Sequence, residues 1–332
     1  MKRLLINPPL LNTPCPWCSE LDNLRELYAC EHTGAITTRT SMLTPYPHDW
    51  EINQYVLFDS TKHQVASVNT QDATSQQTAS LNTIGLSPNN LETSLGFVQI
   101  ISDEQEANQL TKPIIISVAG TPEDVAEAYR SISAKQDQVK MPLAMEINLS
   151  CPNLPGEVSP AYHSEDLVPY LSALQSEILD QKATGVDRGL PIGIKTPPFT
   201  YQDQYDELVS ALLEATKNPD FPSLPLAFVT TTNTLGSSLV MTGDQPTLHS
   251  SNGSGIGGLA GTAIHALSLG NVYTLRQLFD NHDQLKDIQL IGVGGVNDCA
   301  SFERMKAVGA DFVGVATALG VKGSKVFAEI LS

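Results

Sequence analysis

The segment Asn148-Leu149-Ser150-Cys151-Pro152-Asn153 places a thiol between two amides at the end of an apolar run. An Asn side chain donates and accepts hydrogen bonds at once, so Asn148 and Asn153 together could hold a planar heterocycle. Cys151 at such a position could act as a nucleophile or as a general acid or base. A loop around a buried structural cysteine is the alternative interpretation.

A lysine ends the next apolar run in a similar way. Lys195 closes the run IGIK and is followed by Thr196 and a double proline, which fixes the exit of the chain. At the end of a buried strand, its ammonium would stabilise a developing negative charge; a surface lysine is the alternative. The later run TTTNT, residues 230–234, adds hydroxyls and the amide of Asn233. It suits ligand binding and a polar turn equally well.

Two glycine-rich segments follow, at residues 253–261 and 292–296. Glycines allow a close backbone approach, and exposed N–H groups bind phosphate. The first segment contains a formal G-x-G-x-x-G, but no convincing strand precedes it, as a dinucleotide-binding fingerprint requires. The second, with Gly294 and Gly295, directly follows a predicted strand. Together with Thr317 after the next strand, it predicts a phosphate site in preference to plain tight turns.

The elements that position these residues alternate along the chain. Short β-branched runs predict strands at 113–118, 145–148, 192–195, 227–230, 290–293 and 312–315, and helical spacing predicts helices at 122–134, 165–181, 205–216, 265–280 and 300–308. This alternation predicts an α/β fold with a parallel sheet, either a (β/α)8 TIM barrel or an open doubly wound sheet. The barrel is favoured because polar residues or glycines follow nearly every strand, where a barrel has its active site.

We expect a single barrel domain over residues 1–332. The start, MKRLLINPP, predicts a strand entering the fold and not a signal peptide. The segment 67–80, SVNTQDATSQQTAS, is polar and predicts a surface loop or insertion near the front of the chain.

Composition excludes several classes of function. The chain has 19 Lys and Arg against 36 Asp and Glu, a formal net charge of −17, which disfavours nucleic-acid and membrane-surface partners. No apolar run is long enough for a transmembrane helix, so the cytoplasm is the expected location. A local cluster of cations could still bind a small anion.

The cysteines do not form a disulfide framework, since there are five in 332 residues. Cys15 and Cys18 form the unit Cys-Pro-Trp-Cys, which a redox pair would use. Such a pair needs a thioredoxin-like βαβ context, and no such pattern is evident around it. No second Cys pair completes a metal site, so no metal is expected. Two free thiols in a loop is the favoured interpretation.

Taken together, these motifs resemble those of the dihydroorotate dehydrogenase family. The resemblance includes the hexapeptide around Cys151 and the segment Asn82-Thr83-Ile84-Gly85-Leu86. It continues, in the order of the family and over most of the chain, through residues 117–120, 193–198, 233–234, 257–258 and 294–295 and Thr317.

The resemblance implies an FMN-dependent oxidation of dihydroorotate to orotate, a step of pyrimidine biosynthesis. A base takes a proton from C5 while C6 delivers hydride to the flavin. A cysteine as the base is similar to class 1, since the membrane-bound class 2 uses serine there. The resemblance is closest to the fumarate-using branch, which implies fumarate or another soluble electron acceptor and a homodimer.

Carried over position by position, the resemblance assigns roles to individual residues. Cys151 would be the catalytic base, and Lys195 would contact the flavin and stabilise its reduced anion. The substrate would be held by Asn82, Asn148, Asn153, Asn233 and Thr234, with Arg39 nearby. The FMN phosphate would be bound by Gly258, Gly294, Gly295 and Thr317.

The N-terminal third departs from the family pattern. The family has a lysine where this chain has Arg39, and that swap is not conservative. The family's Ala-Ser-Gly loop beneath the flavin is Thr13-Pro14-Cys15 here, and its Glu-Gly-Asn-Pro stretch is replaced within SMLTPYPHDW, residues 41–50. The cofactor site therefore resembles the family more closely than the substrate site does.

Three hypotheses follow. The first is a fumarate-type dihydroorotate dehydrogenase with a diverged N-terminal third. The second is a flavin-dependent paralogue that acts on a related cyclic amide or another activated C–C bond. The third is a non-redox barrel that binds a phosphorylated ligand, which a colourless protein unable to take up FMN would favour.

Overall fold

Eight parallel strands form the central sheet of the computed structural model, which describes residues 2–106, 111–150, 158–186 and 188–332. In spatial order they are β1 (Leu10–Asn12), β14 (Phe312–Val315), β13 (Gln289–Val293), β8 (Phe228–Thr231), β7 (Ile192–Lys195), β6 (Leu143–Asn148), β5 (Ile114–Val118) and β2 (Ile36–Thr37). A parallel bridge between Leu11 and Ala35 joins the first strand to the last. The sheet thus closes into a barrel, and the predicted (β/α)8 fold is confirmed.

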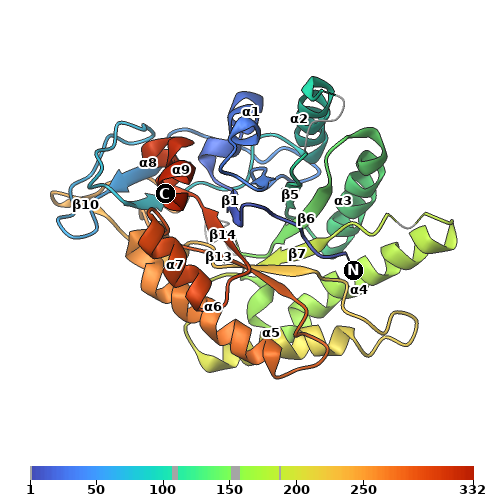
Figure 1. Ribbon diagram of the computed structural model, residues 1–332. Helices are drawn as coiled ribbons and strands as arrows, with labels where there is room; N and C mark the ends of the chain where they lie inside the picture. Colours follow the sequence, from blue (N-terminus) through green and yellow to red (C-terminus); the bar gives the residue numbers. More distant parts are fainter. Residues whose placement is uncertain (1, 107–110, 151–157, 187) are drawn as a thin grey trace.

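Helices cover the outside of this barrel between consecutive strands (Figure 1). They are α1 (Leu21–Ala29), α2 (Leu91–Glu104), α3 (Pro122–Lys135), α4 (Ser164–Ala183), α5 (Gln202–Ala215), α6 (His265–Asp280) and α7 (Cys299–Ala307), followed by α8 (Thr317–Lys322) and α9 (Lys325–Leu331). Short 3-10 turns lie at η1 (Pro16–Cys18), η2 (Gln136–Gln138), η3 (Pro160–Tyr162) and η4 (Thr262–Ile264). The six strands predicted between residues 113 and 315 and the five predicted helices are present, with boundaries shifted by a few residues.

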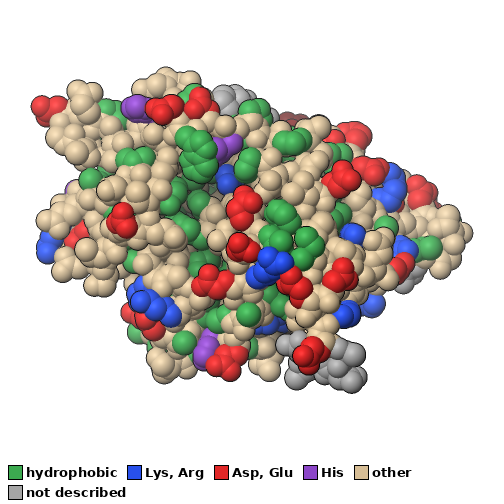
Figure 2. Space-filling model, turned by 90° about the horizontal axis from the view of Figure 1, so that it is seen from above, with side chains coloured by type: hydrophobic (Ala, Val, Ile, Leu, Met, Phe, Trp, Pro, Cys, Tyr) green, Lys and Arg blue, Asp and Glu red, His purple; other side chains and the backbone are tan. Residues whose placement is uncertain are grey.

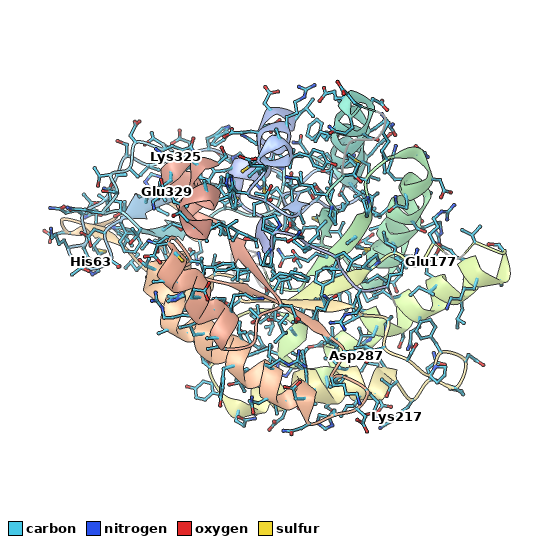
Figure 3. The ribbon with its side chains drawn as sticks, viewed as in Figure 1. His63, Glu177, Lys217, Asp287, Lys325 and Glu329 are labelled. Carbon is cyan, nitrogen blue, oxygen red and sulfur yellow. The ribbon has the colours of Figure 1, made fainter. Side chains whose placement is uncertain are left out.

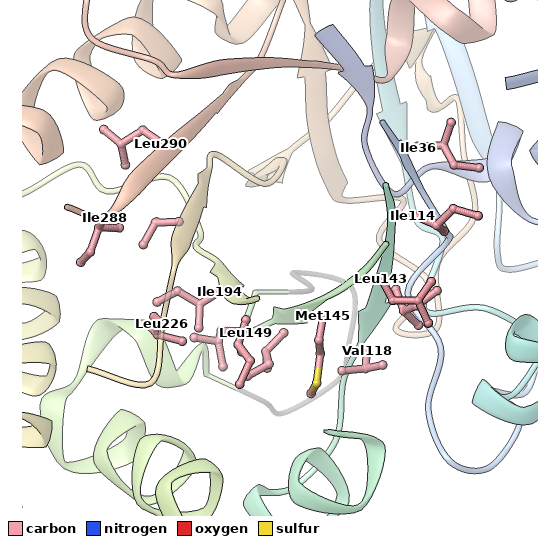
Figure 4. Packing of buried hydrophobic residues seen from close by; sticks show 14 of the residues in the cluster. Ile36, Ile114, Val118, Leu143, Met145, Leu149, Ile194, Leu226, Ile288 and Leu290 are labelled. Carbon is pink, nitrogen blue, oxygen red and sulfur yellow. The ribbon is translucent and has the colours of Figure 1, made fainter. Parts of the chain in front are cut away.

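Two apolar layers follow from the alternation of side chains along the strands. Ile114, Leu143 and Ile194 belong to the large cluster that packs between the sheet and the helices (Figure 4). Their neighbours Ile115 and Ala144 belong to a smaller cluster that includes Phe228 and Ile291 from other strands. The smaller cluster fills the barrel interior, so ligands can reach the barrel only from its ends.

The N-terminal segment closes one end of the barrel and does not form the strand that we predicted there. Leu4 and Ile6 are buried in the inner cluster. The backbone N–H of Leu4 donates to Gln289 Oε1 at 2.8 Å, at the start of β13. Pro8 and Pro9 have no N–H to donate to a ladder, so the first strand begins only at Leu10.

A second, antiparallel sheet adjoins the carboxyl ends of the barrel strands. Its order is β3 (Tyr55–Phe58), β4 (Ala79–Asn82), β12 (Gly257–Gly261) and β9 (Leu235–Ser238); a separate hairpin pairs β10 (Met241–Thr242) with β11 (Gln245–Pro246). Two sequence expectations change here. The glycine-rich segment expected to be a loop becomes strand β12 over its last five residues. The polar segment 67–80 gives its last two residues to β4.

Charged side chains lie mainly on the outside of the molecule. Acidic side chains are spread over the face seen in Figure 2. Lys217, Asp287, Lys325 and Glu329, labelled in Figure 3, are exposed on helix α9 and on loops around the barrel. In the described part of the chain, no helix is long and apolar enough to cross a membrane.

Candidate active site

A cavity opens at the carboxyl ends of the barrel strands, beside the antiparallel sheet. It is lined by residues 14–17, Arg39, Thr40, Tyr55, Ser80, Asn82, residues 84–86, Asn148, Lys195, Asn233, Thr234, Ala260, Ala316 and Thr317. Together with the open solvent at its mouth, it encloses about 730 Å³. Residues that the sequence predicted to act together are therefore neighbours, although they come from separate strands.

A second cavity continues from the first towards the glycine-rich turn after β13. Lys195, Asn233, Thr234 and Thr317 line both cavities, so the two form one elongated space. The far end is lined by Thr13, Gly261, Ile264, residues 293–297, Gly314, Val315 and Ala318. Gly294 and Gly295 thus lie where the sequence placed them. Gly258 lies in β12 outside both linings, and Gly261 occupies the cavity wall instead.

Lys195 is the most unusual side chain of this space. It ends β7, and only 4% of its surface is exposed. Within the described residues, its ammonium makes no hydrogen bond or ion pair. A buried charge without a partner is costly, which favours a bound anion at this position.

The asparagines at the cavity wall hold one another in place. Asn233 Nδ2 donates to Asn148 Oδ1 at 3.2 Å and to the carbonyl oxygen of Ser150 at 2.5 Å. Asn148 Nδ2 donates to Thr40 Oγ1 at 3.1 Å, and Asn82 Nδ2 donates to the carbonyl oxygen of Gly258 at 3.1 Å. These bonds fix the amide orientations before any ligand arrives, which is the preorganisation that a binding site needs.

Arg39 is held at the wall by two contacts with the protein. Its Nη1 donates to Ser19 Oγ at 3.1 Å, and its Nη2 donates to the carbonyl oxygen of Leu86 at 3.0 Å. Leu86 belongs to the segment 82–86 that resembles the family's substrate-binding stretch. The guanidinium therefore links the N-terminal loop to the expected substrate side of the cavity.

The turn at Gly294 and Gly295 requires glycine. Both residues have positive φ, +134° and +71°. The carbonyl oxygen of Gly294 lies 2.8 Å from His265 Nδ1, and a Cβ at Gly295 would lie 2.6 Å from His265 Cβ. Nearby, the hydroxyl of Thr13 is buried and has no hydrogen-bond partner among the residues that the structure describes. A tight backbone turn beside an unsatisfied hydroxyl fits a phosphate group.

Gly295→Ala is expected to destabilise the protein by about 1–3 kcal/mol, because the new Cβ meets positive φ and His265 together. If this turn holds the phosphate of the FMN that the family resemblance implies, the variant should also bind FMN at least tenfold more weakly. Gly185→Ala is the matched control. Gly185 also has positive φ, +79°, but an added Cβ meets nothing within 4 Å. Denaturation and FMN titration of both variants measure the two effects. Equal FMN affinity in both variants would contradict the assignment of this turn.

A further cavity lies on the side of Leu86 and Asn148 that faces the altered segment 41–50. Its walls include Met42, residues 44–47, residues 119–121, Asp124, residues 148–150, residues 158–160 and Tyr170. Tyr46 packs so closely over Gly85 that a side chain there would overlap its ring. The altered segment is thus a wall of the expected substrate side. Cys151 and Asn153 lie outside the described residues.

Sequence reasoning missed several lining residues. Thr40 directly follows Arg39, and Ser80 Oγ lies 2.9 Å from Thr317 Oγ1, yet neither was predicted. Ser80 was assigned to the polar segment, where nothing distinguished it from surface residues. Tyr55 and Trp17 pack edge to face, with ring centroids 5.3 Å apart. The run YVLF at 55–58 has strong strand propensity, so the strand that carries Tyr55 to the cavity wall could have been predicted from it.

The barrel is closed, and a polar cavity around a buried lysine lies at the carboxyl ends of its strands. These features are typical of (β/α)8-barrel enzymes. The family model described as dihydroorotate dehydrogenase matches residues 67–332. The chain belongs to the dihydroorotate dehydrogenase family, whose members are oxidoreductases.

Related sequences and solved structures agree with this assignment. A Streptococcus uberis protein provisionally named dihydroorotate dehydrogenase A (fumarate) is 30% identical over 236 residues, covering 70% of this chain and 66% of that protein. A Streptococcus equi protein with the same provisional name is 29% identical over 252 residues, 76% of this chain and 70% of that protein. The crystal structure of ligand-free DHODH from Eimeria tenella has a TM-score of 0.69 at 16% identity, covering 98% of this chain and 84% of that chain. At such identity, this likeness shows the fold.

Proposed function

We propose that this chain oxidises dihydroorotate to orotate, as a step of pyrimidine biosynthesis, with FMN in the elongated cavity. The observation that carries the proposal is Lys195, a buried ammonium without a partner among the described residues, at the junction of both cavities. An oxidised flavin gains negative charge on reduction, and a fixed cation stabilises that charge best in a site sheltered from water.

The residues present fit FMN at both ends of the cavity. Lys195 would contact the isoalloxazine ring, and Gly294, Gly295 and Thr317 would hold the phosphate. Gly258, which the sequence motif assigns to the phosphate, lies in β12 outside both linings, and its carbonyl oxygen accepts a hydrogen bond from Asn82 Nδ2. When bound, FMN supplies the two-electron acceptor for the C5–C6 bond of the substrate.

The substrate would bind on the asparagine side of the cavity. Asn82, Asn148, Asn233 and Thr234 would hold the ring and its carboxylate, with Asn153 completing the set. Cys151 would take the proton from C5. The roles of Cys151 and Asn153 rest on the sequence motif, and the roles of the others also rest on their common place at the cavity wall.

Electron acceptor and assembly follow the same family pattern. The names of the streptococcal relatives include fumarate, and fumarate or another soluble acceptor is proposed here too. A homodimer in the cytoplasm is the proposed state. Orotate formation from dihydroorotate and fumarate, measured on purified protein whose flavin has been identified, tests the proposed reaction.

A second candidate function is favoured by Arg39. A paralogue acting on a related cyclic amide would explain an arginine that is committed to Ser19 and Leu86 at the position of the family's lysine. The altered segment 41–50 lines the cavity beside Leu86 and Asn148, and it also supports the second candidate function.

Arg39→Lys separates the two functions. If divergence at this position altered substrate choice, the shorter and unforked cation should raise kcat/KM for dihydroorotate about tenfold. Steady-state kinetics with dihydroorotate measure this change. An unchanged or lower value would remove the support that Arg39 gives to the second candidate. Arg39→Gln is the matched control, since it removes the guanidinium charge without introducing the cation of a lysine.

A further inference from the structure

The Cys-Pro-Trp-Cys unit borders the proposed flavin cavity. Cys15 to Cys18 lies in and before η1, between β1 and α1 (Figure 1). Pro14, Cys15, Pro16 and Trp17 form a continuous stretch of the cavity wall. The chain continues through α1 into β2, which makes this segment the first β–α–β unit of the barrel.

The two thiols are buried side by side. Cys15 is 8% exposed and Cys18 is 1% exposed, and their sulfur atoms lie 3.8 Å apart. The backbone N–H of Cys15 donates to Cys18 Sγ at 3.3 Å. A disulfide needs about 2.0 Å between the sulfurs, a change within reach of side-chain rotation in an i, i+3 pair. In the described part of the chain, no group of three or more potential ligands could hold a metal ion.

The surroundings differentiate the two sulfurs. Burial opposes ionisation of Cys18, but the thiol and N–H of Cys15 outweigh it, with help from the charges of Arg39 and Lys195, so the pKa of Cys18 is lowered. Burial and the neighbouring Cys18 sulfur raise the pKa of Cys15. Cys18 is therefore the more readily ionised of the two thiols, and the thiolate is the species that reacts in thiol–disulfide chemistry.

We infer that Cys15 and Cys18 form a dithiol–disulfide couple that exchanges two electrons with the flavin in this cavity, an inference that rests on the flavin site proposed above. Cys15 lies on the cavity wall and Cys18 lies behind it, away from solvent. The flavin is therefore the redox partner with direct access to the pair.

The exchange balances without another reactant. The Sγ–Sγ bond of the oxidised pair accepts two electrons from the reduced, singly protonated flavin and breaks. The one proton released by the flavin goes to Cys15, Cys18 is left as a thiolate, and the flavin returns to its oxidised form. In reverse, the pair loses two electrons and one proton, and the Sγ–Sγ bond forms. The couple thus stores two electrons beside the flavin.

The first test needs no flavin. Flavin-free protein is equilibrated in glutathione buffers of increasing oxidised fraction, alkylated, and digested for peptide mass analysis. A linked Cys15–Cys18 peptide should appear in one two-electron transition, while the exposed Cys299 remains alkylated. A folded protein that never forms the linked peptide would overturn the inference.

The second test counts electrons in the FMN-loaded protein. Anaerobic dithionite titration should consume four electrons per flavin when the pair starts as a disulfide, and two when it starts as a dithiol. Cys18→Ser should consume two in either case, and Cys299→Ala should behave as the parent does. A disulfide that survives full flavin reduction would overturn the inference. Failure of the protein to bind FMN would contradict the proposed function itself. If dihydroorotate reduces the flavin but the Cys15–Cys18 disulfide never forms under oxidising conditions, only the proposed couple is contradicted.

Discussion

Replacing Lys195 with methionine is expected to slow flavin reduction by dihydroorotate by a factor of about 10² to 10³, because the cation that stabilises the reduced flavin is lost. The same change should stabilise the flavin-free protein by on the order of 1 kcal/mol, because an apolar chain of similar length replaces a buried ammonium that has no partner in the described part of the chain. Stopped-flow flavin absorbance and denaturant unfolding measure the two effects.

The opposite signs make this prediction specific to a functional lysine. A lysine that merely supports the fold would lower both activity and stability when replaced. Lys217→Met is the matched control, since Lys217 is exposed and is not among the residues that line either cavity, and it should change neither quantity appreciably. A Lys195→Met variant with parental reduction kinetics would show that the buried charge serves another ligand.

Replacing Cys151 with alanine is expected to leave FMN binding intact and to slow flavin reduction by a factor of about 10² to 10⁴, the range that a positioned general base contributes. The measurement is single-turnover reduction of the flavin by dihydroorotate under anaerobic conditions. Because proton removal from C5 is lost while the flavin site is kept, the variant should still be yellow.

Cys299→Ala is the control for this variant, since Cys299 is exposed at the start of α7. It should reduce its flavin at the parental rate. If Cys151→Ala did the same, the base would have to be another residue, and the motif around residue 151 would have a structural role.

The parallel barrel was predictable because its signals are local. The β-branched runs that became β5 to β8, β13 and β14 each span a few residues, and a polar residue or glycine marks each end. Parallel strands in a barrel bring those ends together, so Asn148, Lys195 and Asn233 could be expected at one cavity from sequence alone.

The antiparallel sheet was not predictable in the same way. Its central pairing joins Asn82 to Gly258, positions far apart in the chain. Strand β12 is Gly-Gly-Leu-Ala-Gly, a composition with weak strand propensity, which is stabilised by the partners on both sides and not by its own residues. Ser80 and Tyr55 reach the cavity through this sheet, and they were missed for that reason.

Anaerobic titration of the purified, FMN-loaded protein with dihydroorotate tests the central claim most directly. The account predicts prompt loss of the flavin absorbance with formation of orotate, and return of the absorbance when fumarate is added. If FMN binds but stays oxidised in excess dihydroorotate, the proposed substrate is contradicted. The second candidate function, in which the same cavity binds a related cyclic amide, would then be favoured.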